Sequence, residues 1–406
     1  MLVAHTSTGK RISLHTGYSK EELRSIQKSS GFYCPQCNEK VQIKAGNKKI
    51  WHFSHVPGVT NCTLSRGESM YHLLGKKLLY EHVIKEFPNA LLEPFFPDIF
   101  QRPDIWIPPQ IPIEFQCSAI PSPILIERSK GYISRGMTPF WILGKKRLKT
   151  LSSTTFQISS FDWLTARISS VNHLPSLYYF CPVEAKVYHL SSIVPVTSTR
   201  VYGKLDSYPL CEYSFQTPHH LQPSKRDSPL FQVKSWLNAK KQWRLHAFKQ
   251  NHQTYRQLKI LFLKNHSTLT YFPSEAGMPV PFAYTLQEPS FIWQSYVLLN
   301  SIIPVQIGES FQFSSVFNHM KWLIHKKIIT LRELPLITDV HYSFAVMHYL
   351  NLLCYYGIIK RVGKKEFVKI RDPVFPNTMD QALANDFILM ESGVKHGVNI
   401  LFSGKM

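Results

Sequence analysis

The sequence predicts a mixed α/β (α+β) protein with a zinc-stapled N-terminal module, an α/β core and a mostly helical, basic C-terminal region. Three features carry this prediction: a Cys-x-x-Cys pair, an apolar helical stretch, and two β-type runs joined by adjacent prolines. The chain has 406 residues, which is enough for two or three domains. We place the boundaries at 1–66 for the N-terminal module, 67–150 for the core, 151–227 for a connecting region, 228–372 for the C-terminal region and 373–406 for a tail.

The N-terminal module is short and polar, with strand-like pieces at 2–5, 41–45 and 50–53. Ser19, followed by Glu21 and Glu22, is typical of a helix start. So small a module with few large apolar groups gains stability from a metal staple.

Zinc is the metal that its cysteines and histidines indicate. The expected tetrahedral ligands are Cys34, Cys37, His52 and Cys62, with His55 as the alternative to His52. On a strand the two histidines point to opposite faces, so only one is a ligand, and we favour His52 because Phe53 then faces the other way. The competing interpretation is three unrelated buried thiols.

The core is expected to begin with a helix at 68–86. Glu68, His72 and Lys76 lie four residues apart and therefore share one helix face. Taken alone, such a row is an ordinary solvated face with i,i+4 pairing. Beside further acids, it offers an environment for phosphate and metal.

The most informative stretch follows at 102–116. Apolar runs around Ile105 and Ile113 indicate two strands, and the prolines 108–109 force a turn, so the hairpin should bring Asp104 and Glu114 together. Two close carboxylates repel unless a cation neutralises them. We therefore expect Mg²⁺ or Mn²⁺ held by Asp104 and Glu114, with Glu68 as a further ligand, directly or through water. This is the layout of a metal-dependent phosphodiesterase.

The rest of the core and the C-terminal region show weaker local patterns. A helix is expected at 122–135, a buried strand at 140–143 and a basic run at 145–149. The connecting region is rich in Ser, Pro and Tyr and indicates irregular chain with short strands. A helix at 344–356, a glycine and a basic hairpin suggest a winged helix at 336–372.

Charge points to a polyanionic partner. Lys and Arg outnumber Asp and Glu by 47 to 26, a formal net charge of +21, which favours nucleic acid first and an anionic membrane surface second. Residues 228–274 contain no acid, and their aromatic residues serve either base stacking or core packing. The expected DNA contacts are Arg128, Lys145, Lys146, Arg147, Lys240, Lys241 and Arg244. For Arg128 a structural ion pair is the alternative.

Several classes are disfavoured. The sequence contains no run of 18 apolar residues, so no membrane span is predicted. The N-terminal residues lack the pattern of a secretory signal. The seven scattered cysteines suit a reducing cytosol and a metal site rather than a disulfide scaffold. We therefore expect a cytoplasmic protein.

The motifs, taken in order, resemble the competence protein CoiA family over roughly the first 145 residues. They are Cys34-Pro35-Gln36-Cys37, Trp51-His52-Phe53-Ser54-His55, Glu68-x-x-x-His72-x-x-x-Lys76, Arg102-Pro103-Asp104, Ile113-Glu114-Phe115-Gln116-Cys117-Ser118, Arg128-x-x-x-Tyr132 and Trp141-Ile142-Leu143. The resemblance implies a PD-(D/E)xK restriction-endonuclease-like core. It also implies a cytoplasmic factor that promotes recombination of incoming single-stranded DNA during natural transformation, with recombination proteins as possible partners.

The active-site pattern departs at one place, because Gln116 stands where that fold usually has Lys. Gln cannot neutralise a developing charge, so Lys76 would supply it, while Gln116 would orient the attacking water. His72 would contact the phosphate or shuttle a proton. The expected activity is Mg²⁺- or Mn²⁺-dependent hydrolysis of DNA phosphodiesters. The alternatives are a non-catalytic DNA-binding recombination adaptor that keeps the nuclease fold, and a repair or restriction nuclease.

Overall fold

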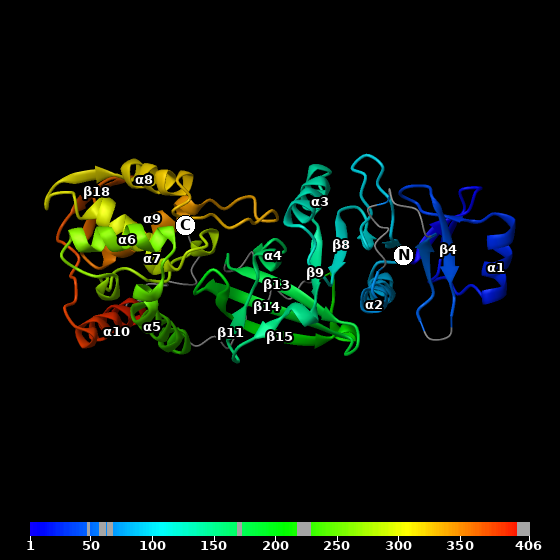
Figure 1. Cartoon of the computed structure of the whole chain (residues 1–406), viewed down its shortest axis with the longest axis horizontal. Coiled ribbons are helices and arrows are strands. Elements are labelled where there is room, and N and C mark those ends of the chain that lie inside the picture. The colour runs from blue at the N-terminus through cyan, green and yellow to red at the C-terminus, as the bar shows by residue number, and fades with distance from the viewer. Residues whose placement is uncertain (47–48, 57–61, 63–67, 169–172, 217–228, 396–406) are drawn as a thin grey trace.

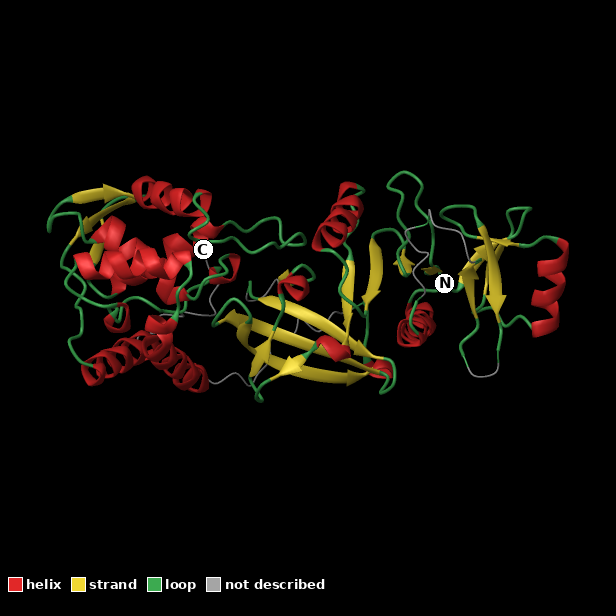
Figure 2. Cartoon of the chain, viewed as in Figure 1, coloured by secondary structure: helices red, strands yellow, loops and turns green. Residues whose placement is uncertain are grey.

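A computed structural model describes residues 1–46, 49–56, 62, 68–168, 173–216 and 229–395. The molecule is elongated, with the N-terminal sheet at one end, a large central sheet, and a helical C-terminal region at the other end (Figure 1). Figure 2 shows that strands dominate the first two parts and helices the third. The mixed α/β fold expected from the sequence is confirmed. Among the described residues, no helix is long and apolar enough to cross a membrane.

The N-terminal module is a five-stranded antiparallel sheet in the order β2-β1-β3-β4-β5. Helix α1 packs Leu23 into its small core and begins with a capping box between Ser19 and Glu22. Its elements are β1 (Val3–His5), β2 (Arg11–Ser13), α1 (Lys20–Ser29), β3 (Phe32–Tyr33), β4 (Lys40–Lys44) and β5 (His52–His55).

The core follows in the order helix, three strands, helix, strand. Strands β6, β7 and β8 are antiparallel neighbours, and β9 runs parallel to β8. These elements are α2 (Met70–Glu86), β6 (Leu91–Leu92), β7 (Ile105–Ile107), β8 (Ile111–Gln116), α3 (Ser122–Ser134) and β9 (Phe140–Gly144).

Two adjacent residues of β8 show how the helices cover the sheet. Phe115 packs so tightly on α2 that a Cβ added at Gly75 would lie 2.0 Å from its ring. The preceding Glu114 contacts Arg128 and Tyr132 of α3. Since neighbouring side chains on a strand point to opposite faces, α2 covers one face of the sheet and α3 the other.

The sequence indicates an irregular connection at 151–227, whereas the structure places long strands there that extend the core sheet. Strand β13 pairs parallel to β9, and β14 and β15 continue as antiparallel neighbours. The elements are η1 (Lys145–Arg147), β10 (Lys149–Thr150), β11 (Thr155–Gln157), α4 (Ser160–Trp163), β12 (Arg167–Ile168), β13 (Pro175–Cys181), β14 (Lys186–Pro195), β15 (Arg200–Pro209) and η2 (Leu210–Glu212).

The C-terminal region packs its helices around the fully buried helix α7 and carries a three-stranded sheet in the order β16-β18-β17. The elements are α5 (Pro229–His246), η4 (Ala247–Lys249), α6 (Gln253–Lys264), η5 (Leu269–Tyr271), η6 (Ala283–Thr285), α7 (Ser290–Val297), the π-helical η7 (Leu298–Ile302), β16 (Ser310–Gln312), α8 (Phe313–His325), α9 (Tyr342–Tyr355), β17 (Ile359–Arg361), β18 (Glu366–Lys369) and α10 (Met379–Lys395). The sequence suggests a weakly ordered tail from 373, but α10 is a regular helix that packs on α5.

Candidate functional site

The central feature of the core is a buried ammonium group surrounded by carboxylates. Lys76 of α2 is fully buried, and its Nζ lies 2.7 Å from Glu68 Oε1, 2.5 Å from Glu93 Oε1 and 3.1 Å from Asp104 Oδ1. We call Glu68, Glu93 and Asp104 the carboxylate cage. An unpaired buried ammonium would be costly, so the three acids stabilise its charged form.

Local structure explains how α2 and the hairpin meet at the cage. The Ser69 side chain caps α2 by accepting from the His72 backbone, which places His72 and Lys76 one turn apart on the same face. On β8, the backbone N–H of Phe115 donates to Asp104 Oδ2 at 2.9 Å. The hairpin therefore fixes Asp104 before any ligand is present.

His72 bridges two members of the cage. Its Nε2 lies 3.2 Å from Asp104 Oδ2 and its Nδ1 lies 3.7 Å from Glu68 Oε1. Burial alone would raise the pKa of Asp104, but the positive charge of Lys76 and the contact with His72 hold it well below its usual range. Burial likewise opposes ionisation of Glu68, and Lys76 again outweighs it, so the pKa of Glu68 is lowered. Both acids are carboxylates at neutral pH.

Glu93 is a member of the cage that the sequence does not reveal. Its backbone N–H donates to Asp104 O at 2.9 Å, which brings Glu93 beside the start of β7. Its Oε2 accepts hydrogen bonds from the backbone N–H groups of Leu2 at 3.0 Å and Val3 at 3.1 Å, and Arg102 lies 3.8 Å away. Its backbone lies in the left-handed region at φ 48°, and the hydrogen bonds and ion pairs of Glu93 hold it in this strained conformation.

Glu114 lies in a different setting from the one expected. It accepts from Tyr132 Oη at 2.5 Å and from Arg128, on the face covered by α3. Burial raises its pKa to about 7, with Arg128 acting in the opposite sense. In the described part of the chain, no group of three donors spaced for a metal includes Glu68, Glu93, Asp104 or Glu114, so the carboxylate cage is arranged around Lys76 rather than around a preformed metal position.

Two other core residues also find partners within the protein. Arg128 makes the structural ion pair considered as its alternative role, with Glu114 as its partner. Gln116 is half-buried at the end of β8, and its amide donates to the carbonyl of Ser118. Neither side chain contacts the cage in this arrangement.

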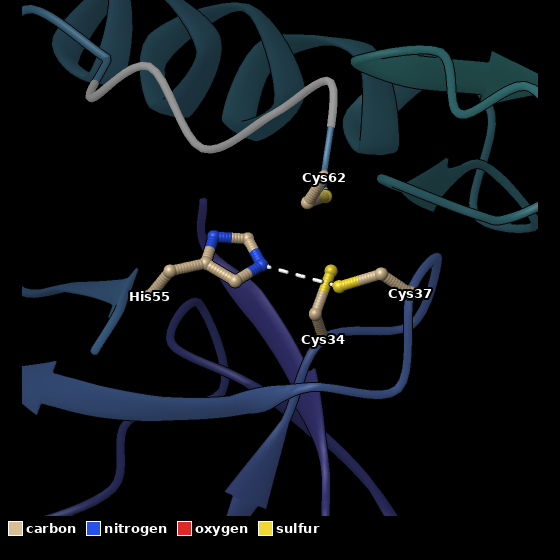
Figure 3. A group of neighbouring side chains, drawn as sticks. All are labelled: Cys34, Cys37, His55 and Cys62. Carbon is tan, nitrogen blue, oxygen red and sulfur yellow. Dashed lines mark hydrogen bonds between the residues drawn. The ribbon is translucent and has the colours of Figure 1, made fainter. Parts of the chain in front are cut away.

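The second site lies in the N-terminal module, where Cys34, Cys37, His55 and Cys62 converge (Figure 3). Their donor atoms all lie within 4.8 Å of one another, and Cys37 Sγ is 3.3 Å from His55 Nε2. Three sulfurs and one imidazole suit a tetrahedral structural zinc. The donor set therefore fits zinc, with His55, the alternative ligand, in place of the favoured His52.

The register of β4 and β5 explains this correction. His55 pairs with Val41, close to the Cys34–Cys37 turn, whereas His52 pairs with Lys44 at the far end of β4. His52 instead places its Nδ1 2.9 Å from the carbonyl oxygen of Ile50. Position along the strand, rather than side-chain alternation alone, decides which histidine reaches the sulfurs.

Several expected DNA contacts prove to be structural. Lys240 and Arg244 are fully buried and both lie 2.8 Å from Asp386 of α10, so they cannot reach DNA. Arg147 forms an ion pair of 2.7 Å with Asp162. Reading the acid-free span 228–274 as a DNA surface is thus wrong for its central cations, and its tryptophans at 236 and 243 are core.

Three of the expected contacts remain at the surface. Lys145 lies over the ring of Tyr188 and Lys146 over that of Tyr71, with the ammonium groups 4.7 and 5.1 Å from the ring centroids. Lys241 is exposed on α5. The first two flank the end of the core sheet near Cys117, whose backbone lies against Gly144.

Comparison with known proteins supplies three adjoining family matches. Residues 15–65 match the N-terminal domain of competence protein CoiA, residues 68–223 its nuclease-like domain, and residues 231–383 its C-terminal domain. The competence protein CoiA of Bacillus subtilis (strain 168) is 28% identical over 341 residues, which cover 83% of this chain and 89% of that protein. No solved structure matches the chain.

Proposed function

Since this chain belongs to the competence protein CoiA family and carries its nuclease-like domain, we propose that it processes DNA during natural transformation by metal-dependent hydrolysis of phosphodiester bonds. The observation that carries the proposal is the carboxylate cage. Three acids, of which Glu93 is fully buried and Glu68 and Asp104 are largely buried, converge within 3.1 Å of the Lys76 ammonium at the start of β7, beside a histidine.

The cage suits a hard divalent cation because all its donors are carboxylate oxygens. Glu68, Glu93 and Asp104 would hold Mg²⁺ or Mn²⁺, with Glu93 taking the place that the sequence assigns to Glu114. Such a cation lowers the pKa of a bound water and stabilises charge on the phosphate. In the arrangement described here, the ammonium of Lys76 lies between these acids, so cation binding requires Lys76 to move.

Once displaced by the cation, Lys76 would act on the substrate phosphate. It lies four residues after His72, on the same helix face, and its positive charge would neutralise charge that develops on the phosphate. His72 contacts a carboxylate with each ring nitrogen, so it would accept or return a proton after one of these contacts is exchanged for the substrate. Gln116, at the same strand end, would orient the attacking water.

The proposed substrate is incoming DNA, single-stranded or in recombination intermediates. Lys145 and Lys146 would contact its phosphates, since both are cations at the surface of the core. Recombination proteins are the partner class that this role implies, and the cytoplasm is where they would meet.

A cleavage assay on single-stranded, duplex and flap DNA with Mg²⁺ or Mn²⁺ tests the proposal. Asp104→Asn should abolish cleavage and also Mn²⁺ binding measured by isothermal titration, with an unchanged circular dichroism spectrum. The matched control is Asp98→Asn, whose carboxylate is exposed and pairs only with Arg135 among the ion pairs described. Unchanged Mn²⁺ affinity in Asp104→Asn would contradict the proposed site.

The second candidate is a DNA-binding recombination adaptor that retains the fold without catalysis. It is favoured by the charge balance of the cage, because Lys76 and Arg102 already offset much of the negative charge of its three acids. This function predicts equal DNA binding by wild type and Asp104→Asn, and no cleavage of any substrate with either metal.

A further inference from the structure

Helix α8 carries an exposed basic face with an exposed tryptophan at its centre. We define the α8 face by its solvent-exposed residues, namely Ser315, Asn318, Lys321, Trp322, His325, Lys326 and Lys327. Their spacing of three and four residues places the helical members on one side of α8. Figure 1 shows α8 at the outer edge of the C-terminal region.

The charges of this face are not neutralised by neighbouring acids. Residues 310–332 contain no Asp or Glu. In the part of the chain that the structure describes, no ion pair involves Lys321, Lys326 or Lys327. This is the reverse of the acid-free span at 228–274, where Asp386 takes up the charges of Lys240 and Arg244.

Trp322 is the unusual member of the face. The chain has eight tryptophans, and Trp322 is the one that is exposed, with half of its surface open to solvent. A tryptophan usually buries its large apolar ring, so an exposed one beside lysines fits a ligand that combines flat rings with negative charge. Bases stack on aromatic side chains, and phosphates pair with neighbouring cations.

The surrounding topology agrees with a nucleic-acid surface on α8 instead of on the usual reading helix. The order of α7, β16, α8, α9, β17 and β18 is that of a winged helix, in which the second helix of the pair normally reads the major groove. Here that helix is α9, which is largely buried and has no Lys or Arg. Helix α9 therefore offers no Lys or Arg to DNA phosphates, and its partner α8 carries the exposed charge.

The wing joins this surface at the start of α8. The backbone N–H of Phe313 donates to the carbonyl of Lys365 at 2.8 Å, so the turn between β17 and β18 lies at the beginning of the helix. Lys360, Lys364 and Lys365 are exposed there. Cations thus lie at both ends of α8, about 20 Å apart at the helical rise per residue.

We propose that the α8 face is a second nucleic-acid site, remote from the carboxylate cage, which binds single-stranded DNA by stacking a base on Trp322 and pairing phosphates with Lys321, Lys326 and Lys327. Single strands are favoured over duplex because a splayed base can reach an aromatic ring that no groove-reading helix accompanies. The inference shares with the proposed function only its ligand, DNA, and it needs neither metal nor hydrolysis.

The test is binding of a fluorescein-labelled oligothymidylate, followed by anisotropy without added divalent cation. Reversing Lys321, Lys326 and Lys327 to Glu should weaken binding at least tenfold. It should also reduce the slope of log K against log salt by about 2, since each phosphate neutralised on a single strand contributes about 0.7. The matched control reverses Lys234, Lys249 and Lys264, which are exposed in the acid-free span and carry the same charge change. An equal loss in both triple variants would mean that net charge alone drives binding and would overturn the proposal.

Trp322 supplies an independent readout. Trp322→Ala should weaken binding about tenfold, within the range known for base–aromatic stacking, and Trp322→Phe should retain most of the affinity. Quenching of intrinsic fluorescence on binding should be lost in Trp322→Phe. Unaltered binding by Trp322→Ala, or tighter binding to duplex of the same length, would contradict the assignment.

A final comparison separates this site from the nuclease proposal. Asp104→Asn should bind the oligonucleotide as wild type does, because the cage and α8 are different parts of the molecule. Normal binding with no cleavage by wild type would remove the proposed hydrolysis and leave the α8 site standing. If the variant with Lys321, Lys326 and Lys327 reversed both cleaves DNA with metal and binds the oligonucleotide as wild type does, the α8 site is removed and the proposed hydrolysis stands.

Discussion

Replacing Lys76 with Met tests whether the cage depends on its internal cation. Met has a side chain of similar length and fills the same space, so the change removes charge while creating little cavity. Three carboxylates, one fully buried and two largely buried, then lose the ammonium that lies within 3.1 Å of each. Removing one partner of a buried ion pair typically costs about 3–5 kcal/mol, because the remaining charge stays buried without compensation.

The adjacent lysine provides a matched control. Lys77 is about half exposed and makes one i,i+4 pair with Glu81 at 3.7 Å. Lys77→Met should therefore change the free energy of unfolding by less than about 0.5 kcal/mol. The difference between the two variants corresponds to roughly 6–20 °C in melting temperature for a unit of this size, measured by differential scanning fluorimetry.

The stability difference between wild type and Lys76→Met should depend on pH. In wild type, the lowered pKa values of Glu68, Glu93 and Asp104 contribute stability that is present above their ordinary pKa values near 4 and lost as pH falls through the folded values. In Lys76→Met, burial dominates and raises these pKa values, so the variant recovers stability as pH falls. The gap between wild type and variant should be largest at pH 8 and should shrink towards pH 5.

Manganese completes the experiment. In Lys76→Met the cage loses its central cation, so Mn²⁺ at a hundredfold excess over Kd should raise the free energy of unfolding of this variant by about 2.7 kcal/mol. The increase for wild type should be smaller, because Lys76 competes with the metal. A variant as stable as Lys77→Met, or one whose deficit does not depend on pH, would refute the account of the cage. Equal stabilisation of wild type and variant by Mn²⁺ would show that Lys76 does not compete with the metal.

Two further predictions concern the other sites. The wild-type protein should contain about one zinc per chain by elemental analysis; His55→Ala and Cys34→Ser should lose it and His52→Ala should keep it, and the reverse histidine result would contradict the register of β4 and β5. Burial raises the pKa of Glu114 to about 7, so its contribution to stability is full below its ordinary pKa and is lost as pH rises through 7. Glu114→Gln should accordingly remove up to about 3 kcal/mol of pH dependence between pH 5 and 8 in urea unfolding, and an unchanged slope would argue against a buried, titrating Glu114.

The sequence predicts the local elements well and the long-range partners poorly. The hairpin at β7 and β8 and the helix α2 follow from apolar periodicity and turn residues within short windows. Glu93 belongs to no such pattern, because its role comes from Leu2, Val3 and Lys76, which are distant in sequence. Nothing local distinguishes it from a surface acid.

The charges at 228–274 fail for a related reason. Counting acids within a window treats Lys240 and Arg244 as unpaired, yet their counter-charge Asp386 lies 142 residues after Arg244. Strand β13 illustrates the same limit for secondary structure, since all seven of its residues are buried and the alternation that marks a half-exposed strand is absent. A low-charge, tyrosine-rich segment can therefore be central sheet rather than connecting chain.

The N-terminal module and the nuclease-like core share one buried charge network, so neither is complete alone. Glu93 binds Lys76 with one oxygen and caps the backbone of β1 with the other. Arg102, buried beside Glu93, lies 3.2 Å from Met1 Sδ. The pKa of His55 in the zinc cluster is lowered, first by burial and then by the positive charge of Arg102. Removing the module would expose Glu93 and Lys76 to water and weaken the pairing that orders Asp104. A cleavage assay on an isolated core would therefore test a different electrostatic site from the one in the full chain.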